Sequence, residues 1–186
     1  MILSLTGTLL LSILLTFAMI KLAVRLNIVD RPDSFLKPHA RTTPYMGGIG
    51  VFFSVIFFYI TDIHFVIPSI ILLILGLYDD IKSLNPKIRI LVEFLTTSLF
   101  VVLYSSETNP FWLILLVLTG VALINSVNMI DGMDGVCTGT VLIALASFYF
   151  LTGDWRILFF IAALSGFLFS TSILQKYFSG MQDHTF

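Results

Sequence analysis

Two groups of acidic side chains stand at the ends of apolar segments of this sequence. Asp131 and Asp134 follow Asn128 at the end of one apolar run, and Asp79-Asp80 closes another. A carboxylate at the edge of hydrocarbon is costly to desolvate, so by default it marks a functional site. These aspartates are therefore most simply interpreted as ligands of a cation.

The types of ligand indicate magnesium. Carboxylate oxygens are hard ligands, and Mg²⁺ usually takes one or two of them while water and substrate phosphates fill its other positions. The chain has one Cys and three His, and these residues form no Cys/His set for zinc. For Asp79-Asp80 an alternative stays open, which is a solvated acidic cap paired with Lys82.

Four polar side chains recur at every third position: Asn125, Asn128, Asp131 and Asp134. In a helix they would form one polar stripe. Gly132 and Gly135 weaken a helix there, so the end of the stripe is expected either as helix or as an opened turn. A structural polar seam between helices is the alternative, although two acids without an adjacent basic residue would repel each other in such a seam.

The first polar loop offers groups that suit phosphates. Lys37 and His39 lie in it between Arg31 and Arg41, and cationic or hydrogen-bonding side chains of this kind bind phosphate oxygens. The glycine pair that begins at Gly47 would let a ligand or a second helix approach closely. The loop can also be interpreted as a basic anchor followed by a helix start.

Glu93 lies about one turn inside an apolar segment. An ionisable group at that depth is a functional candidate. It could equally pair with Arg89, which precedes it by four residues on the same helical face. Both interpretations stay open at this point.

Composition places these motifs in a membrane. The chain is 58% hydrophobic and 11% charged with a mean hydropathy of +1.02, whereas soluble domains have about 25% charged residues. A net charge of −1 gives no sign of nucleic-acid binding. We expect an all-α, polytopic transmembrane helical bundle of about seven spans: residues 2–24, 47–62, 65–78, 88–104, 111–128, 136–151 and 156–173.

The second and third of these spans are short and adjacent. A single helix from 47 to 78 would measure about 48 Å at ~1.5 Å per residue, well beyond a hydrocarbon layer of roughly 30 Å. Asp62, His64 and Pro68 also interrupt the apolar run. We therefore expect the two segments to form a tight hairpin.

The distribution of cations predicts the orientation. With the N-terminus outside, nine of the ten Lys and Arg lie in cytoplasmic segments or at their boundary, and Arg156 alone falls outside. This is a strong positive-inside bias. The same orientation places the acidic and amide groups together on the cytoplasmic face: Asp79, Asp80, Asn128, Asp131 and Asp134.

The polar segments form three motifs, which read Asp30-Arg-Pro-Asp33…Lys37-x-His39…Pro44-x-x-Gly47-Gly48, then Gly76-x-x-Asp79-Asp80, then Asn125-x-x-Asn128-x-x-Asp131-Gly-x-Asp134-Gly135. In order and spacing they resemble the motifs of the polyprenyl-phosphate N-acetylhexosamine-1-phosphate transferase family of multi-spanning membrane enzymes. The first motif looks more like the branch that starts surface-polysaccharide, teichoic-acid or enterobacterial-antigen synthesis, the undecaprenyl-phosphate N-acetylglucosaminyl-1-phosphate transferases.

The resemblance implies a reaction and a set of roles. N-acetylhexosamine-1-phosphate would pass from a UDP-N-acetylhexosamine to undecaprenyl phosphate, with release of UMP and a requirement for Mg²⁺. Asp79 and Asp80 would be the catalytic residues, in the metal and lipid-phosphate region. The implied metal ligands are Asp79, Asp80 and Asp131. The implied substrate-binding residues are Lys37, His39, Asn128, Asp131 and Asp134.

The resemblance also implies a multi-pass protein of the bacterial cytoplasmic (inner) membrane with its active face toward the cytoplasm. A homo-oligomer is left open. Family members are longer, so we expect residues 1–186 to be a single membrane domain, truncated relative to the family and incomplete or inactive alone. Thr171 and Met181 stand where the family carries an Asn and the Asp of a Gly-Asp pair.

Two other classes of function compete with the transferase. One is a non-catalytic membrane protein that binds the lipid carrier or scaffolds glycan assembly. The other is a transporter whose acids bind a coupling ion. The acids gather at one interface rather than at mid-bilayer, and the sequence has no inverted repeat, which disfavours the transporter.

Overall fold

The chain folds into helices at each place where a span is expected. The computed structural model describes residues 1–26, 28–30, 43, 44, 46–130 and 135–182. In these ranges the prediction of an all-α bundle is confirmed, with one pair of two-residue strands as the exception. The helices are α1 (Ile2–Arg25), α2 (Gly47–Tyr59), α3 (Ile63–Lys82), α4 (Pro86–Tyr104), α5 (Pro110–Ile130), α6 (Val136–Thr152) and α7 (Ile157–Gln182).

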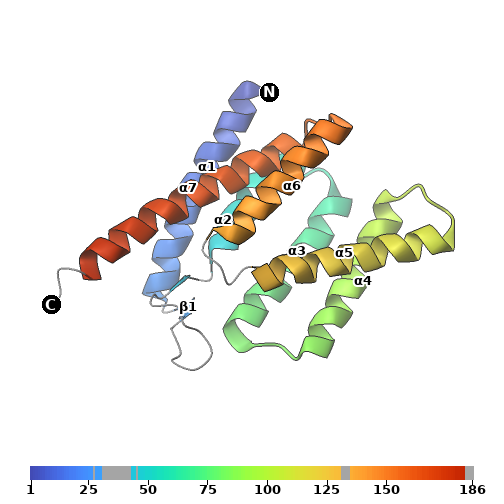
Figure 1. The fold of residues 1–186 in the computed structure, drawn as a ribbon, viewed down its shortest axis with the longest axis horizontal. Helices are drawn as coiled ribbons and strands as arrows, with labels where there is room; N and C mark the ends of the chain where they lie inside the picture. Colours follow the sequence, from blue (N-terminus) through green and yellow to red (C-terminus); the bar gives the residue numbers. More distant parts are fainter. Residues whose placement is uncertain (27, 31–42, 45, 131–134, 183–186) are drawn as a thin grey trace. The chain divides into compact units, whose positions relative to one another are not determined.

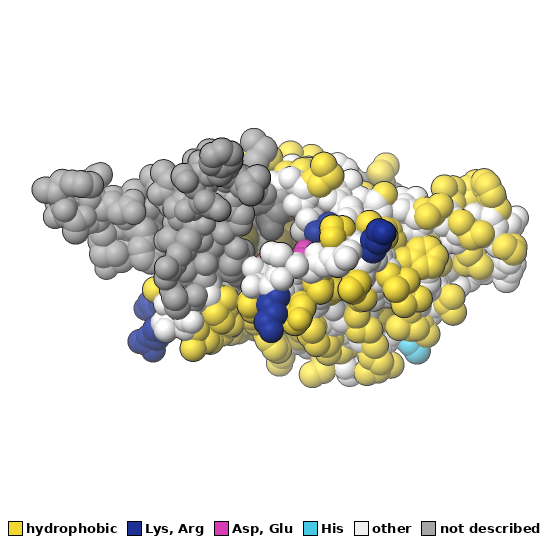
Figure 2. Space-filling view, turned by 90° about the horizontal axis from the view of Figure 1, so that it is seen from below, with side chains coloured by type: hydrophobic (Ala, Val, Ile, Leu, Met, Phe, Trp, Pro, Cys, Tyr) yellow, Lys and Arg dark blue, Asp and Glu magenta, His cyan; other side chains and the backbone are white. Residues whose placement is uncertain are grey.

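Most of these helices have the composition of membrane helices. α1, α3 and α5 are long and apolar enough to cross a bilayer, while α2, α6 and Ile157–Ile173 of α7 are shorter apolar helices. α4 has 19 residues and carries charged side chains in its first two turns. Figure 2 views the molecule from below relative to Figure 1 and shows apolar side chains over much of the described surface. Helices that face lipid require such a surface.

The expected break between the second and third spans is confirmed, because α2 ends at Tyr59 and α3 begins at Ile63. Asp62 is the N-cap of α3, and its carboxylate accepts a hydrogen bond from the Phe65 N–H at 3.3 Å. Pro68 lies within the expected third span, 65–78, and it is buried inside α3. A proline in the second turn removes one helical hydrogen bond, and membrane helices tolerate this loss.

Close packing divides the helices into two compact units. The first unit comprises Met1–Val55 and Thr138–Phe186, and the second unit comprises Ile56–Cys137. The first unit also contains the antiparallel strand pair, β1 (Val29–Asp30) and β2 (Thr43–Pro44). This pair flanks residues 31–42 in the sequence, and the predicted site residues Lys37 and His39 in that range lie outside the described ranges.

The first unit is held together by small side chains between α1 and α7. These are the first and last helices of the chain, and they pack against each other (Figure 1). Ser12 of α1 and Ser170 of α7 are fully buried. The Ser12 hydroxyl donates to the Ala163 carbonyl at 2.6 Å, and Gly166 lies directly against α1. Small residues of this kind let helix backbones approach in a membrane, where lipid removes the hydrophobic driving force.

The second unit is built from consecutive helices, with α4 packed against both α3 and α5 (Figure 1). Gly120 of α5 permits the α4–α5 contact, because a Cβ at this position would lie 2.5 Å from Cγ2 of Thr97. At one end of the unit the Tyr104 hydroxyl donates to Asp62. The opposite end carries the acidic pair that follows Gly76.

Substitution of Gly166 tests the packing of the first unit. A Cβ at Gly166 would lie 2.7 Å from the Leu9 carbonyl oxygen and 3.0 Å from Cβ of Ser12. We expect Gly166→Ala to lower the unfolding free energy in detergent micelles by about 1–3 kcal/mol. Gly7→Ala is the matched control, because no atom lies within 4 Å of a Cβ there. Equal stability of the two variants would contradict the α1–α7 contact.

The contact of Asp62 with Tyr104 predicts a pH dependence. The hydrogen bond from Tyr104, followed by that from the Phe65 N–H, lowers the pKa of Asp62 below 3.8. The resulting stability is present above the ordinary aspartate pKa and is lost as pH falls through the lower folded pKa. We expect Tyr104→Phe to reduce the acid-induced fall in unfolding temperature, measured from about pH 5 to about pH 2. Tyr149→Phe is the control. If unfolding temperature depends on pH in the same way in Tyr104→Phe and in this control, the stabilising contact between Tyr104 and Asp62 is refuted.

Candidate functional site

The turn after α3 places the first predicted site residues. α3 continues to Lys82, so Asp79 and Asp80 lie in its last turn rather than beyond its end. Ser83 then adopts a left-handed conformation with φ of 48°, and its N–H bonds to the Asp79 carbonyl at 2.8 Å. The Leu84 N–H donates to Asp79 Oδ1 at 2.7 Å. One oxygen of the Asp79 carboxylate is therefore committed to the turn.

The other oxygen of Asp79 faces Arg89 on α4. Nη1 of Arg89 donates to Asp79 Oδ2 at 3.1 Å, an ion pair that bridges α3 and α4. Nε of Arg89 lies 3.3 Å from Oε1 of Glu93, one helical turn further along α4. Of the two interpretations of Glu93, pairing with Arg89 is the one that the structure shows.

α5 completes this cluster through its asparagines. Nη2 of Arg89 donates to Asn125 Oδ1 at 2.8 Å. The Asn125 amide donates to Glu93 Oε2 and to the Val121 carbonyl, the latter at 3.0 Å. Asn125 is therefore part of a polar seam between α4 and α5. Asn128, one turn further on, accepts from Arg89 Nη1 at 3.1 Å when its amide oxygen faces the guanidinium.

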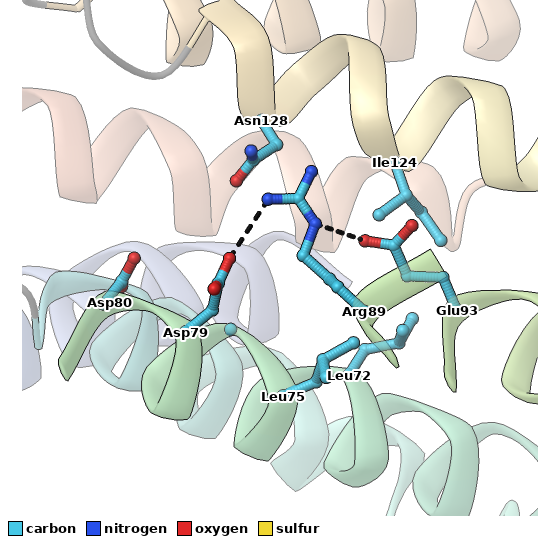
Figure 3. A pocket seen from close by; sticks show the side chains of 9 residues that line it. Leu72, Leu75, Asp79, Asp80, Arg89, Glu93, Ile124 and Asn128 are labelled. Atoms are coloured by element: carbon cyan, nitrogen blue, oxygen red, sulfur yellow. Dashed lines mark hydrogen bonds and ion pairs between the residues drawn. The ribbon is translucent and has the colours of Figure 1, made fainter. Parts of the chain in front are cut away.

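These side chains border a small cavity between α3, α4 and α5 (Figure 3). Its volume is about 100 Å³, which suits a group the size of a phosphate rather than a whole nucleotide sugar. The lining combines aliphatic side chains of α3 and α5 with charged and amide side chains of all three helices. The lining residues are Leu72, Leu75, Gly76, Asp79, Asp80, Arg89, Glu93, Ile124 and Asn128.

Among the described residues that line the cavity, negative charges outnumber positive ones. Asp79, Asp80 and Glu93 supply three carboxylates, and Arg89 supplies one guanidinium. Glu93 is 3% exposed, whereas the Asp79 side chain is 20% exposed and Asp80 lies at the surface. A phosphate could approach this rim only if a cation offsets the excess negative charge.

The donor set at the rim fits a magnesium ion in part. Asp79, Asp80 and Asn128 offer hard oxygen atoms of the type that Mg²⁺ prefers, and one or two carboxylates are its usual protein share. In the described ranges, no group of three or more His, Cys, Asp or Glu side chains is close enough to hold a metal. Asp131 and Asp134, the other predicted carboxylates of this face, fall outside those ranges.

The structure thus brings together three of the predicted site residues, Asp79, Asp80 and Asn128. The alternative of an acidic cap holds for Asp79 in one respect, because its carboxylate caps the turn. The cation that it pairs with is Arg89 rather than the expected Lys82, whose Nζ lies 5.7 Å from the Tyr78 ring centroid.

Arg89 is the residue that the motif analysis missed. It enters the analysis as a positive-inside cation and as one potential partner of Glu93, whereas it contacts side chains from three helices. Its signal in the sequence is a charge pair at i and i+4 inside an apolar helix, which must be satisfied by further polar groups nearby.

Comparison with known proteins identifies the family of the chain. The profile described as glycosyl transferase family 4 matches residues 62–173, which include the whole cavity. The chain belongs to glycosyl transferase family 4. The family match covers α3 to α6 and the apolar part of α7.

Three curated relatives are named as transferases. An undecaprenyl-phosphate alpha-N-acetylglucosaminyl 1-phosphate transferase of Thermotoga maritima is 33% identical over 69% of the chain and 45% of that protein. A probable undecaprenyl-phosphate N-acetylglucosaminyl 1-phosphate transferase of Bacillus subtilis is 28% identical over 92% of the chain and 56% of that protein. A phospho-N-acetylmuramoyl-pentapeptide-transferase of Dictyoglomus thermophilum is 29% identical over 74% of the chain and 54% of that protein.

The chain spans about half the length of these family members. No solved structure matches it.

Ser83 offers a test of the turn that holds Asp79. A left-handed serine is strained, and glycine adopts this conformation without the steric cost. We expect Ser83→Gly to raise the unfolding free energy by about 0.5–1 kcal/mol in detergent. The control is Ser105→Gly at the C-cap of α4, where φ is −81°, and glycine should destabilise there through chain entropy. If Ser83→Gly destabilises the protein as Ser105→Gly does, Ser83 does not adopt the left-handed conformation.

Proposed function

We propose that this chain carries the acceptor side of an enzyme that transfers N-acetylhexosamine-1-phosphate from a UDP-sugar to undecaprenyl phosphate, with release of UMP. The observation that supports this most directly is the cavity, whose lining combines aliphatic side chains with charged and amide side chains. A lipid that ends in a phosphate likewise combines an apolar part with a charged group. Membership of family 4 and the names of the relatives point to the same chemistry.

The chemistry explains why the cavity needs few groups. A phosphate monoester has a second pKa near ~6, so at neutral pH the acceptor is already largely ionised and requires no strong general base. The difficulty is to bring an anionic acceptor to an anionic diphosphate. When bound, Mg²⁺ would screen this repulsion and align the attack.

We assign roles to the chain's own residues accordingly. Asp79 and Asp80 would hold the cation at the mouth of the cavity, with Asp131 as a further ligand. Asn128 would donate to a phosphate oxygen beside them. Lys37, His39 and Asp134 would contact the nucleotide or its diphosphate. Each assignment other than those to Asp79, Asp80 and Asn128 falls on residues outside the described ranges.

The site would open at the cytoplasmic face of the bacterial inner membrane. One substrate is lipid-borne and the other is aqueous, so the cavity must face the interface between hydrocarbon and water. The excess of Lys and Arg on the same predicted side supports this orientation.

The second candidate function is non-catalytic binding of the lipid carrier. The cavity volume of about 100 Å³ favours it in one respect, since the space suits a lipid phosphate and not a whole UDP-sugar. Binding of undecaprenyl phosphate is common to both functions, and release of UMP separates them.

The test uses the 186-residue chain in nanodiscs. We expect it to bind undecaprenyl phosphate, but not undecaprenol, in a Mg²⁺-dependent manner. Release of UMP from UDP-N-acetylglucosamine when both substrates are present would show catalysis and would correct the expectation that residues 1–186 are inactive alone. Asp80→Asn should reduce UMP release by about 100-fold or more, because it removes an electrostatic contact at the reacting phosphates. The measurements are native mass spectrometry of the lipid complex and chromatographic detection of UMP.

The matched control is Asp154→Asn, which removes an equally charged side chain that pairs with Arg156 at 2.7 Å in the other unit. Full activity of the Asp80→Asn chain would remove Asp80 from the site. Binding without UMP release would support the non-catalytic function, and the absence of both would refute the two proposals together.

A further inference from the structure

Arg89 forms a hydrogen bond to Oδ2 of Asp79, the oxygen that would coordinate a cation at the proposed site. Oδ1 of Asp79 accepts from the Leu84 N–H of the turn, and Oδ2 accepts from Nη1 of Arg89 (Figure 3). A carboxylate oxygen that already faces a guanidinium must exchange that partner before it can coordinate a metal. The structure therefore shows Asp79 with a built-in positive partner.

Two carboxylates share this guanidinium, and they differ in burial. The Glu93 side chain is 3% exposed and the Asp79 side chain is 20% exposed. A buried carboxylate that loses its cation is left with a large desolvation penalty, whereas one at the rim regains water. Loss of Arg89 would therefore cost the buried Glu93 carboxylate more free energy than it would cost Asp79.

Asn125 strengthens the inner half of the cluster. Its oxygen accepts from Nη2 of Arg89 at 2.8 Å, and its amide donates to Oε2 of Glu93. Arg89, Glu93 and Asn125 form a closed set of contacts without Asp79. The guanidinium can leave Asp79 and still keep two partners, since it carries five N–H donors.

We propose that Arg89 is an internal counter-ion that competes with a divalent cation for Asp79, and that Glu93 and Asn125 are the positioning residues that determine how easily it yields. This rests on the proposed cation site at Asp79 and Asp80. A guanidinium released from Asp79 has Nη1 available to donate to a phosphate oxygen at the same rim. Exchange at Asp79 thus couples cation binding to the capture of an anionic group.

The proposal predicts opposite effects for the two neighbours of Arg89 on the affinity for Mn²⁺, a paramagnetic probe for a magnesium site. Glu93→Gln removes the inner carboxylate, so Arg89 should hold Asp79 more strongly and Mn²⁺ should bind about tenfold more weakly. The double variant Arg89→Gln/Glu93→Gln frees Asp79 without changing the net charge of the cluster. It should bind Mn²⁺ about tenfold more tightly than the parent chain.

The measurement is electron paramagnetic resonance titration of the 186-residue chain in detergent with Mn²⁺ alone. The double variant also avoids the unpaired buried Glu93 that Arg89→Gln would leave, and a fold check by circular dichroism accompanies each chain. Lys87→Gln is the control, because it removes an exposed cation of the same helix and should change the affinity less than about twofold.

A double variant that binds Mn²⁺ no more tightly than the parent, or not at all, would overturn the competition. So would a Glu93→Gln chain with unchanged or higher affinity. The proposed function fails by a different result, which is the absence of both undecaprenyl phosphate binding and UMP release in the parent chain. The two failures are therefore distinguishable.

Discussion

The carboxylate of Glu93 imposes the strongest constraint on the second unit. It is 3% exposed among apolar helices, so it requires a positive partner and further donors. Arg89 supplies the charge from the same helical face, and Asn125 supplies an amide from α5. Because the guanidinium has more N–H groups than Glu93 can accept, it also reaches Asp79 on α3. One charge pair on α4 thereby connects three helices.

The two units solve the problem of helix packing in a membrane differently. In the first unit α1 and α7 approach through Ser12, Gly166 and other small residues, so contact depends on van der Waals fit and a few hydroxyl bonds. In the second unit the contact of α4 with its neighbours includes a network of charged and amide groups. The first arrangement is suited to a fixed scaffold, and the second permits an exchange of partners.

The position of the cavity follows from where α3 ends. Asp79 stabilises the left-handed turn at Ser83 with one oxygen and meets Arg89 with the other, so it links the fold to the proposed chemistry. The aliphatic side chains of Leu72 and Leu75 continue from this rim along α3. The proposed binding of a lipid-borne phosphate depends on this meeting of aliphatic and charged side chains.

The sequence by itself determined the class of the protein and the location of its helices. Long apolar segments can satisfy their backbone only as helices, and Asp62 marks the break between α2 and α3 because a carboxylate caps a helix well. It also singled out Asp79, Asp80 and Asn128, which line one cavity, since polar groups at the end of apolar runs are conspicuous. Pro68 does not end α3, because neighbours in a bundle can compensate for one lost hydrogen bond.

Only the tertiary structure decided which partners these groups take. Spacing along α4 shows that Arg89 can reach Glu93, but the sequence contains no sign that the same guanidinium also contacts Asp79 and Asn125. Those contacts depend on how α3 and α5 pack against α4, and this packing is set by close approaches such as that of Gly120 to Thr97. A periodic pattern specifies the face of one helix, whereas the geometry between helices arises from the fit of all three.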